Sequence, residues 1–335
     1  MKLNFDHKQL SAHCESGATV NLLGYYNVKI SEPMVFGIGA GYYFGHLPFM
    51  KMNFSPITTY RSLPGLVFSR TCKNLGLSYE RKTFKSPQKS MDELDRVLDS
   101  GNPCGVQVGT FHLPFFPQEY RMHYNMHNMV VFGKENNEYF VADSVVPGDC
   151  RISYDDFVRV RYPKGAFAPN GKMYHITNIP ENIDFKAPAI TGIKKTCYEM
   201  LDIPFPLVGI KGIRYFARRL RKWPMKKGNK VASQYLGQSI LSLEEIGTGG
   251  AGYRFIYGAF LNEAADLLQR EELKEIGKEM GEAGNRWRNF SYLGARNCKN
   301  RAEPEHTYDF LADIIMDCAD MEEKIFKKLR KVNFK

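Results

Sequence analysis

The sequence of 335 residues has no apolar run of the roughly 18 uninterrupted residues that a membrane-spanning helix needs. Its first residues are polar, so the sequence predicts no secretory signal peptide. The seven cysteines are odd in number and scattered, and they include no C-x-x-C pair. This pattern is typical of neither a disulfide scaffold nor a zinc site. We therefore expect a cytoplasmic protein with reduced thiols, no metal ion and no membrane association.

Acidic residues are missing from residues 203–243, although the whole chain carries a formal net charge of +10. Nine Lys and Arg side chains fall within residues 211–230. Such a segment favours an acidic partner, although it is also compatible with a solvated basic surface. No helix-turn-helix, zinc-finger or RNA-recognition pattern accompanies it, so nucleic acid is not the expected partner. The expected partner of this segment is therefore an acidic protein or a phosphate-bearing ligand.

The chain length and the change of pattern predict two domains. Residues 1–185 mix helix and strand signals, whereas residues 186–335 are mostly helical in pattern, so the expected class is α+β. In the first part we expect helices at 63–76 and 90–100, the latter with a capping box at Ser90, and a strand at 105–109. In the second part we expect helices at 253–269, 270–283, around Trp287 and at 306–331.

Glycines alternate with aromatic residues at 36–45, which predicts a backbone in close contact with its neighbours, lining a pocket. The spacing does not match a dinucleotide-binding fingerprint. Glycines return at 247–252, directly before a helical pattern. Free N–H groups at that helix start, with Gly249, Gly250 and Arg254, are predicted to bind a phosphate or a carboxylate. Alternatively, these glycines only permit a tight turn and close helix packing.

Cys14 precedes a short apolar stretch that reads as a buried helix beginning at the cysteine itself. Ser11 is a possible N-cap, and Glu15 suits the first turn. A thiol at a helix N-terminus has a lowered pKa and is more readily ionised, as a nucleophile requires. The alternative is a buried structural cysteine, which is common.

Residues 127–133 and 138–143 are two apolar runs separated by a short polar turn, which predicts a β-hairpin. His127 opens the first strand and Asp143 closes the second. A two-residue loop places Asp143 opposite Val130, on the wrong face for His127, whereas an odd loop or a bulge places it opposite Met129 on the same face. A pair of His127 and Asp143 therefore requires one of these irregularities.

Cys14, His127 and Asp143 together form a possible Cys–His–carboxylate set. In such a set the imidazole ion-pairs with the thiolate and protonates the leaving group, while the carboxylate fixes the tautomer of the imidazole. His123, four residues earlier, is the rival base.

With these features the first half resembles the N-terminal domain of the butirosin biosynthesis protein H family. The residues that carry the resemblance are 13–16 with the following helix, the segment 36–45, and 127–133 with Asp143. The second half resembles the uncharacterised domain that usually follows it, chiefly through residues 245–254 and 260–265.

The resemblance implies a fold like that of papain-type cysteine peptidases for residues 1–185 and a mostly α-helical domain for residues 186–335. It also implies an acyltransferase of antibiotic biosynthesis. Such an enzyme takes an aminoacyl group from the phosphopantetheine thioester of an acidic acyl carrier protein and forms an amide with an aminoglycoside or polyamine. Cys14 is then acylated, His127 is the general base and acid, and Asp143 orients it, with no cofactor beyond the carrier's own arm.

Papain-like enzymes usually place an oxyanion-hole Gln six residues before the cysteine, whereas Gln9 lies five before Cys14. Gln9 is therefore a weak candidate, and the backbone N–H of Cys14 is the safer donor. Two other functions remain open at this stage. One is a thioesterase or peptidase with the same triad, and the other is a binding module with an inactive site.

Overall fold

The computed structural model describes residues 1–6, 11–246 and 249–334 and divides into two compact units. Unit 1 comprises Met1–Val35 and Val67–Ile183, and unit 2 comprises Phe36–Leu66 and Asp184–Lys335. The sequence predicted one boundary between residues 175 and 200, whereas the chain passes between the compact units at three points, after Val35, Leu66 and Ile183. Residues 36–66, however, belong with the C-terminal helices, which no local signal had indicated.

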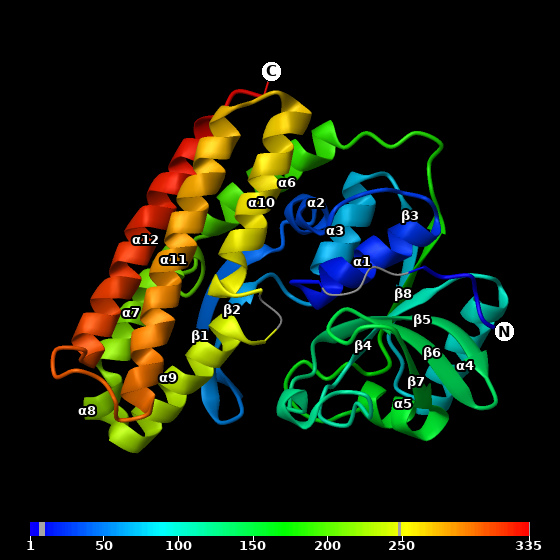
Figure 1. Ribbon diagram of the computed structural model, residues 1–335, viewed down its shortest axis with the longest axis horizontal. Coiled ribbons are helices and arrows are strands. Elements are labelled where there is room, and N and C mark those ends of the chain that lie inside the picture. The colour runs from blue at the N-terminus through cyan, green and yellow to red at the C-terminus, as the bar shows by residue number, and fades with distance from the viewer. Residues whose placement is uncertain (7–10, 247–248, 335) are drawn as a thin grey trace. The chain divides into compact units, whose positions relative to one another are not determined.

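Unit 1 is built on a six-stranded antiparallel sheet in the order β3-β8-β4-β5-β6-β7 (Figure 1). Its strands are β3 (Ser78–Lys82), β4 (Cys104–Val108), β5 (His127–Glu135), β6 (Glu138–Asp143), β7 (Asp149–Ser153) and β8 (Met173–Asn178). The helices α1 (Cys14–Tyr25), α4 (Pro87–Asp99) and α5 (Tyr154–Arg161) lie in this unit. The helices α2 (Glu32–Ile38) and α3 (Leu66–Asn74) contain its boundaries with unit 2.

The core of unit 1 forms where α4 and α5 cover the central strands. Leu94 of α4 and Phe157 of α5 are fully buried against Val106 of β4 and Met129 of β5. Helix α1 packs on β5, which places the start of α1 close to the start of that strand.

The strand pairing of β5 and β6 contains the irregularity that a His127–Asp143 pair requires. The loop Asn136–Asn137 has only two residues, both with positive φ, as a type I′ hairpin turn demands. The register nevertheless shifts by one between Val131 and Gly133, so Asp143 lies opposite Met129. A β-bulge at this point, not the loop, puts Asp143 on the face of His127.

Helix α1 begins at Cys14, as predicted, but the N-cap predicted for it and the start predicted for α4 are wrong. The N-cap of α1 is His13, not Ser11, because the His13 Nδ1 atom accepts the Ser16 N–H at 3.3 Å. Helix α4 begins three residues before the predicted capping box, with Ser86 as N-cap accepting the Lys89 N–H at 3.3 Å. Pro87 at the first helical position favours this earlier start.

Unit 2 combines a β-hairpin with a set of helices (Figure 1). The hairpin consists of β1 (Tyr42–Met52) and β2 (Ser55–Arg61). The helices are α6 (Lys186–Leu201), α7 (Gly209–Arg221), α8 (Trp223–Lys227), α9 (Asn229–Glu244), α10 (Arg254–Leu268), α11 (Glu272–Cys298) and α12 (Tyr308–Lys331). The two helices predicted at 270–283 and around Trp287 are in fact the single helix α11, which no Pro interrupts.

The glycines of segment 36–45 permit close packing within unit 2, as predicted, but the space beside them is filled. A Cβ atom on Gly37 would lie 2.1 Å from the Phe260 ring, and one on Gly192 of α6 would lie 2.2 Å from the Gly37 carbonyl oxygen. The ring of Phe36 stacks on Tyr253 at 5.3 Å. These residues are core rather than the walls of a pocket.

Candidate active site

Cys14 is the first residue of α1, and its side chain is only 4% exposed. The positive end of the helix dipole at this position favours the thiolate over the thiol. The following residues are nearly all buried, so the helix has little freedom to shift the sulfur atom. The structure thus gives Cys14 the position that the sequence predicted.

The two residues before Cys14 are held by the carboxylate of Glu32, the first residue of α2. The Glu32 Oε1 atom accepts the His13 N–H at 2.7 Å and the Ser16 O–H at 3.1 Å, and its Oε2 atom accepts the Ala12 N–H at 3.0 Å. Burial raises the pKa of Glu32, and these three hydrogen bonds oppose that rise. Nothing in the sequence marks Glu32 as part of the site, because an acidic residue in a helix's first turn gives no sign of a distant partner.

His127 and Asp143 form a buried hydrogen-bonded pair across the β5–β6 hairpin. The His127 Nε2 and Asp143 Oδ2 atoms are 2.6 Å apart. Asp143 is fully buried, and its Oδ1 atom accepts the Val145 N–H at 2.8 Å. Because a carboxylate only accepts hydrogen bonds, Nε2 carries the hydrogen and Nδ1 is left for Cys14. The backbone also joins this hairpin to the start of α1, since the Ser11 N–H donates to the Ser144 carbonyl at 2.9 Å.

The pKa of His127 reflects these two neighbours. Burial by itself lowers this pKa, but the Asp143 carboxylate and then the Cys14 side chain, which is hydrogen-bonded to the imidazole, raise it to about 10. The imidazole is therefore protonated at neutral pH when it faces a thiolate. The arrangement can hold a thiolate–imidazolium pair, which combines a nucleophile with an acid for the leaving group.

His123, the rival base, has different surroundings. Its ring stacks on Phe111 at 4.1 Å between centroids and 8° between planes, and Phe111 is itself exposed. The ring of Phe116 instead meets His127 edge-on at 5.1 Å and shields the His127–Asp143 pair. Of the two histidines, the structure brings His127 to Cys14 and Asp143.

Asn128 is a further polar neighbour of Cys14 that the sequence analysis missed. Its Nδ2 atom lies 3.8 Å from the Cys14 Sγ atom and donates to the Met126 carbonyl at 3.0 Å. Its Oδ1 atom accepts the Tyr174 O–H at 3.1 Å, which fixes which end of the amide faces the sulfur. Strand alternation places Asn128 on the opposite face of β5 from His127, toward α1.

Cys14 differs from the other six cysteines, all of which are free thiols. Burial raises the pKa of each of the other six: Cys72, Cys104, Cys150, Cys197, Cys298 and Cys318. A raised thiol pKa leaves little thiolate near neutral pH. These six thiols are poor nucleophiles, so a reactive cysteine is expected at Cys14 alone.

Arg254, predicted to bind a substrate anion, has an internal partner in unit 2. It is fully buried, and its Nε and Nη2 atoms donate to Glu322 Oε1 at 3.0 and 2.8 Å. Gly249 and Gly250 both have positive φ, as a tight turn requires. The Ala251 N–H beside them donates to Glu244 Oε2 at 3.0 Å, so a carboxylate of the chain already binds there. Gln9 lies outside the described residues.

Within residues 1–6, 11–246 and 249–334, no group of three or more His, Cys, Asp or Glu side chains is arranged to hold a metal ion. None of the helices in these ranges is both long enough and apolar enough to span a bilayer. Cys14, His127 and Asp143 all lie in unit 1.

Comparison with known protein families gives two matches. Residues 13–144 match the N-terminal domain of butirosin biosynthesis protein H, and residues 155–329 match a domain of unknown function, DUF4872. The chain belongs to the butirosin biosynthesis protein H-like family. The chain matches no curated protein at a significant level.

Membership of the butirosin biosynthesis protein H-like family indicates a biosynthetic enzyme. The first matched region contains Cys14, His127 and Asp143. It also includes residues 36–66, which fold with unit 2. The boundary between the two family regions therefore does not coincide with the boundary between the two compact units.

Proposed function

We propose that the protein is a cysteine-dependent acyltransferase. It moves an aminoacyl group from the phosphopantetheine thioester of an acidic carrier protein to an amine, and so forms an amide in antibiotic biosynthesis. The observation that supports it most is the buried set of Cys14, His127 and Asp143, with a papain-like division of roles. The family's link to butirosin biosynthesis supports a biosynthetic rather than a degradative reaction.

The reaction proceeds in two transfers that leave the enzyme unchanged. The Cys14 thiolate attacks the thioester carbonyl, the bond to the phosphopantetheine sulfur breaks, and that sulfur takes the proton of the His127 imidazolium. The acceptor amine then attacks the acyl carbonyl, the bond to Cys14 Sγ breaks, and the amine proton passes to neutral His127, which restores the thiolate–imidazolium pair as the amide forms. Asp143 keeps the imidazole in one tautomer throughout, and the backbone N–H of Cys14 is the proposed donor to the oxyanion.

Water competes with the amine for the acyl-enzyme, so transfer demands an acceptor held in place and a site with little access to bulk water. Cys14, His127 and Asp143 are each at most 4% exposed, which is compatible with such a site. The test is incubation with an acyl-loaded carrier protein, with and without an aminoglycoside. Amide formation that requires the amine supports the proposal, acid release without amine indicates a hydrolase, and no turnover indicates a binding module.

The pH dependence of acylation tests the role of Asp143. The pKa of His127, raised to about 10, means that the imidazolium is present below that pH and is lost above it. We expect the rate of Cys14 acylation by a carrier-free thioester to fall on the alkaline side near pH 10. Asp143→Asn removes the negative charge that raises this pKa, so the alkaline fall moves to lower pH.

Asp143→Asn should also slow acylation by about 10⁴-fold, whereas His127→Ala should cost nearly as much as the loss of Cys14. In the wild type both Asp143 oxygens accept hydrogen bonds, one from His127 and one from the Val145 N–H. The amide in Asp143→Asn would have to place its NH₂ group against one of these two donors, so the variant loses a hydrogen bond that positions the imidazole. His123→Ala is the matched control and should leave the profile unchanged. If the alkaline fall in rate shifts in His123→Ala but not in Asp143→Asn, His127 is not the base.

The basic segment is proposed to steer the acidic carrier protein. Arg214 pairs with Asp320 and Glu323, and Arg221 pairs with Asp313, so these two cations are partly neutralised within unit 2. We expect Arg218→Glu with Lys226→Glu and Lys227→Glu, at three exposed positions, to slow association with the carrier.

The effect of this charge reversal should shrink as ionic strength rises, since screening acts over about 10 Å at 0.1 M salt. A control with the same change of net charge is the reversal of the exposed Lys278, Lys324 and Lys331. Stopped-flow binding of the carrier and turnover of a carrier-free thioester are measured for both triple variants. Equal losses on carrier and carrier-free substrate would show that the basic segment has only a structural role.

A further inference from the structure

The turn between β1 and β2 exposes an aromatic side chain in an unfavourable backbone conformation. Asn53 and Phe54 have φ of 51° and 68°, in the left-handed region that favours Gly and tolerates Asn. Phe54 is 90% exposed. A bulky apolar residue here gains nothing from burial and costs backbone strain, so the fold itself gives no reason for it.

The strand before this turn carries a bulge that exposes two more apolar side chains. The register jumps from Leu47–Ile57 to Lys51–Pro56, so residues 48–50 are extra on the β1 side. Phe49 is 67% exposed, and Met50 beside it is also exposed. Bulges redirect side chains and end regular pairing, and this one brings apolar groups to the surface near Phe54.

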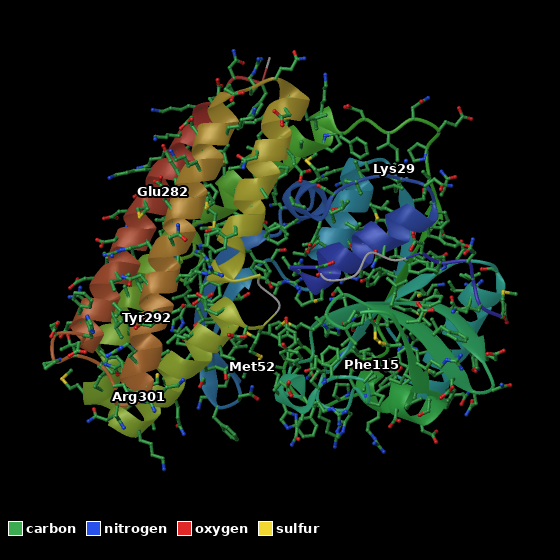
Figure 2. All side chains as sticks on the ribbon, viewed as in Figure 1. Lys29, Met52, Phe115, Glu282, Tyr292 and Arg301 are labelled. Carbon is green, nitrogen blue, oxygen red and sulfur yellow. The ribbon has the colours of Figure 1, made fainter. Side chains whose placement is uncertain are left out.

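The same hairpin contacts α7 and α8, which carry the basic segment. The His46 ring lies 5.1 Å from that of Phe216 of α7 and 6.2 Å from that of Trp223, the first residue of α8. Met225, two residues further on, is 82% exposed. Figure 1 shows the turn of the hairpin and α8 at the same end of unit 2, and Figure 2 labels Met52 on the hairpin.

The segment that contains the hairpin and the segment that contains α7 and α8 both lack acidic residues. None occurs in residues 33–79 or 203–243, whereas Lys51 on the hairpin and Lys222, Lys226 and Lys227 around α8 are exposed. Exposed apolar side chains at the same end of unit 2 as exposed cations suit the binding of an acidic protein, with aromatic anchors for the contact and charges that steer the encounter.

We propose that the tip of the hairpin, residues 48–54, is the apolar anchor by which the protein binds its acidic carrier protein. This inference rests on the proposed acyl transfer and adds the contact that holds the carrier once the basic segment has attracted it. Phe54 inserts between side chains of the carrier, and Phe49 and Met50 widen the contact. The strain at Phe54 is then compensated by binding rather than by folding.

Two substitutions in the turn separate docking from folding. Phe54→Gly removes both the strain and the aromatic ring, whereas Asn53→Gly, the matched control, removes strain of the same kind and keeps the ring. If Phe54 served only the fold, both variants would behave alike. We expect both to unfold at equal or higher denaturant concentration than the wild type, and only Phe54→Gly to lose carrier binding.

The probe is an acidic holo-acyl carrier protein loaded with a short aminoacyl chain, compared with the same acyl group on a carrier-free thioester. Phe54→Gly should raise KM for the loaded carrier about tenfold, the size of effect expected for an anchor residue. It should leave acylation by the carrier-free thioester unchanged. Asn53→Gly should match the wild type with both substrates.

Several results would overturn this inference while leaving the proposed chemistry intact. One is wild-type use of the carrier-free thioester without use of the loaded carrier, and another is equal carrier KM for Phe54→Gly and the wild type. A third is sedimentation with anionic phospholipid vesicles that Phe54→Gly abolishes while carrier use is unaffected, which would assign the tip to a lipid surface. Failure of the wild type with both substrates contradicts the proposed function itself.

Discussion

Replacing Cys14 with Ala should abolish acyl transfer, with a loss on the order of 10⁴- to 10⁶-fold in turnover, because no other group can carry the acyl chain. The substitution removes one sulfur atom, with its hydrogen bond to His127 and its long contacts to the Met126 carbonyl at 3.7 Å and to Asn128 Nδ2 at 3.8 Å. The free energy of unfolding should therefore change little. Turnover of the carrier-free thioester in the presence of an aminoglycoside measures the loss.

The matched control for Cys14→Ala is Cys104→Ala, because Cys104 is also a buried free thiol of unit 1. Its pKa is raised to about 12 by burial, so it should contribute nothing to catalysis. Cys104→Ala should lower stability slightly and leave the rate unchanged. Residual turnover of Cys14→Ala close to that of the wild type would remove Cys14 from the mechanism.

The second large effect concerns the buried ion pair of unit 2. Glu322 accepts not only from Arg254 but also from Trp287 Nε1–H at 2.6 Å and from the Tyr42 O–H at 2.7 Å. The Arg254 guanidinium lies 4.5 Å from the centroid of the Trp287 ring. Arg254→Met leaves the Glu322 carboxylate buried without its countercharge, which should lower the free energy of unfolding by about 3–5 kcal/mol.

The measurement is urea unfolding followed by tryptophan fluorescence. Both tryptophans of the chain, Trp223 and Trp287, lie in unit 2, so the signal reports on that unit. The control is Arg286→Met, which breaks an ion pair between Arg286 of α11 and Asp317 of α12 at the exposed surface of unit 2. Arg286→Met should lower the free energy of unfolding by no more than about 1 kcal/mol.

Arg254→Met also decides between the structural and the substrate-binding roles of Arg254. The structure gives the guanidinium a buried partner, so the variant should still be acylated by a carrier-free thioester under conditions where it remains folded. A variant of unchanged stability that no longer uses the substrate would support the anion site predicted from the sequence. The sequence could not distinguish these roles, since Glu322 is 68 residues from Arg254.

The sequence predicted the local parts of the site better than their assembly. The helix at Cys14 and the strands that carry His127 and Asp143 follow from local patterns of apolar residues. The register that brings the last two together depends on a bulge between Val131 and Gly133, of which the only local sign is a glycine within the strand pattern. The alternation of side chains along the strands shows that a His127–Asp143 pair requires a bulge or an odd loop. The position of the bulge depends on how both faces of the sheet pack.

The predictions that differ from the structure concern features that depend on tertiary contacts or on a choice between neighbouring residues. Ser90 and Ser86 are both suitable N-caps, and Pro87 favours the earlier one. Glu32 and Asn128 act on Cys14 through tertiary contacts, so nothing near them in the sequence marks them. The membership of residues 36–66 in unit 2 also depends on contacts with helices more than a hundred residues away.

The proposed mechanism requires Cys14 to carry a covalent acyl group between donor and acceptor. The most direct test is peptide mass mapping of the wild-type protein after brief exposure to an acyl thioester donor without amine. The mechanism predicts one added acyl group, on the peptide that contains Cys14, and its disappearance when an aminoglycoside is added. An acyl group on Cys104 or Cys150, or amide formation with no acyl-enzyme at any time, would contradict it.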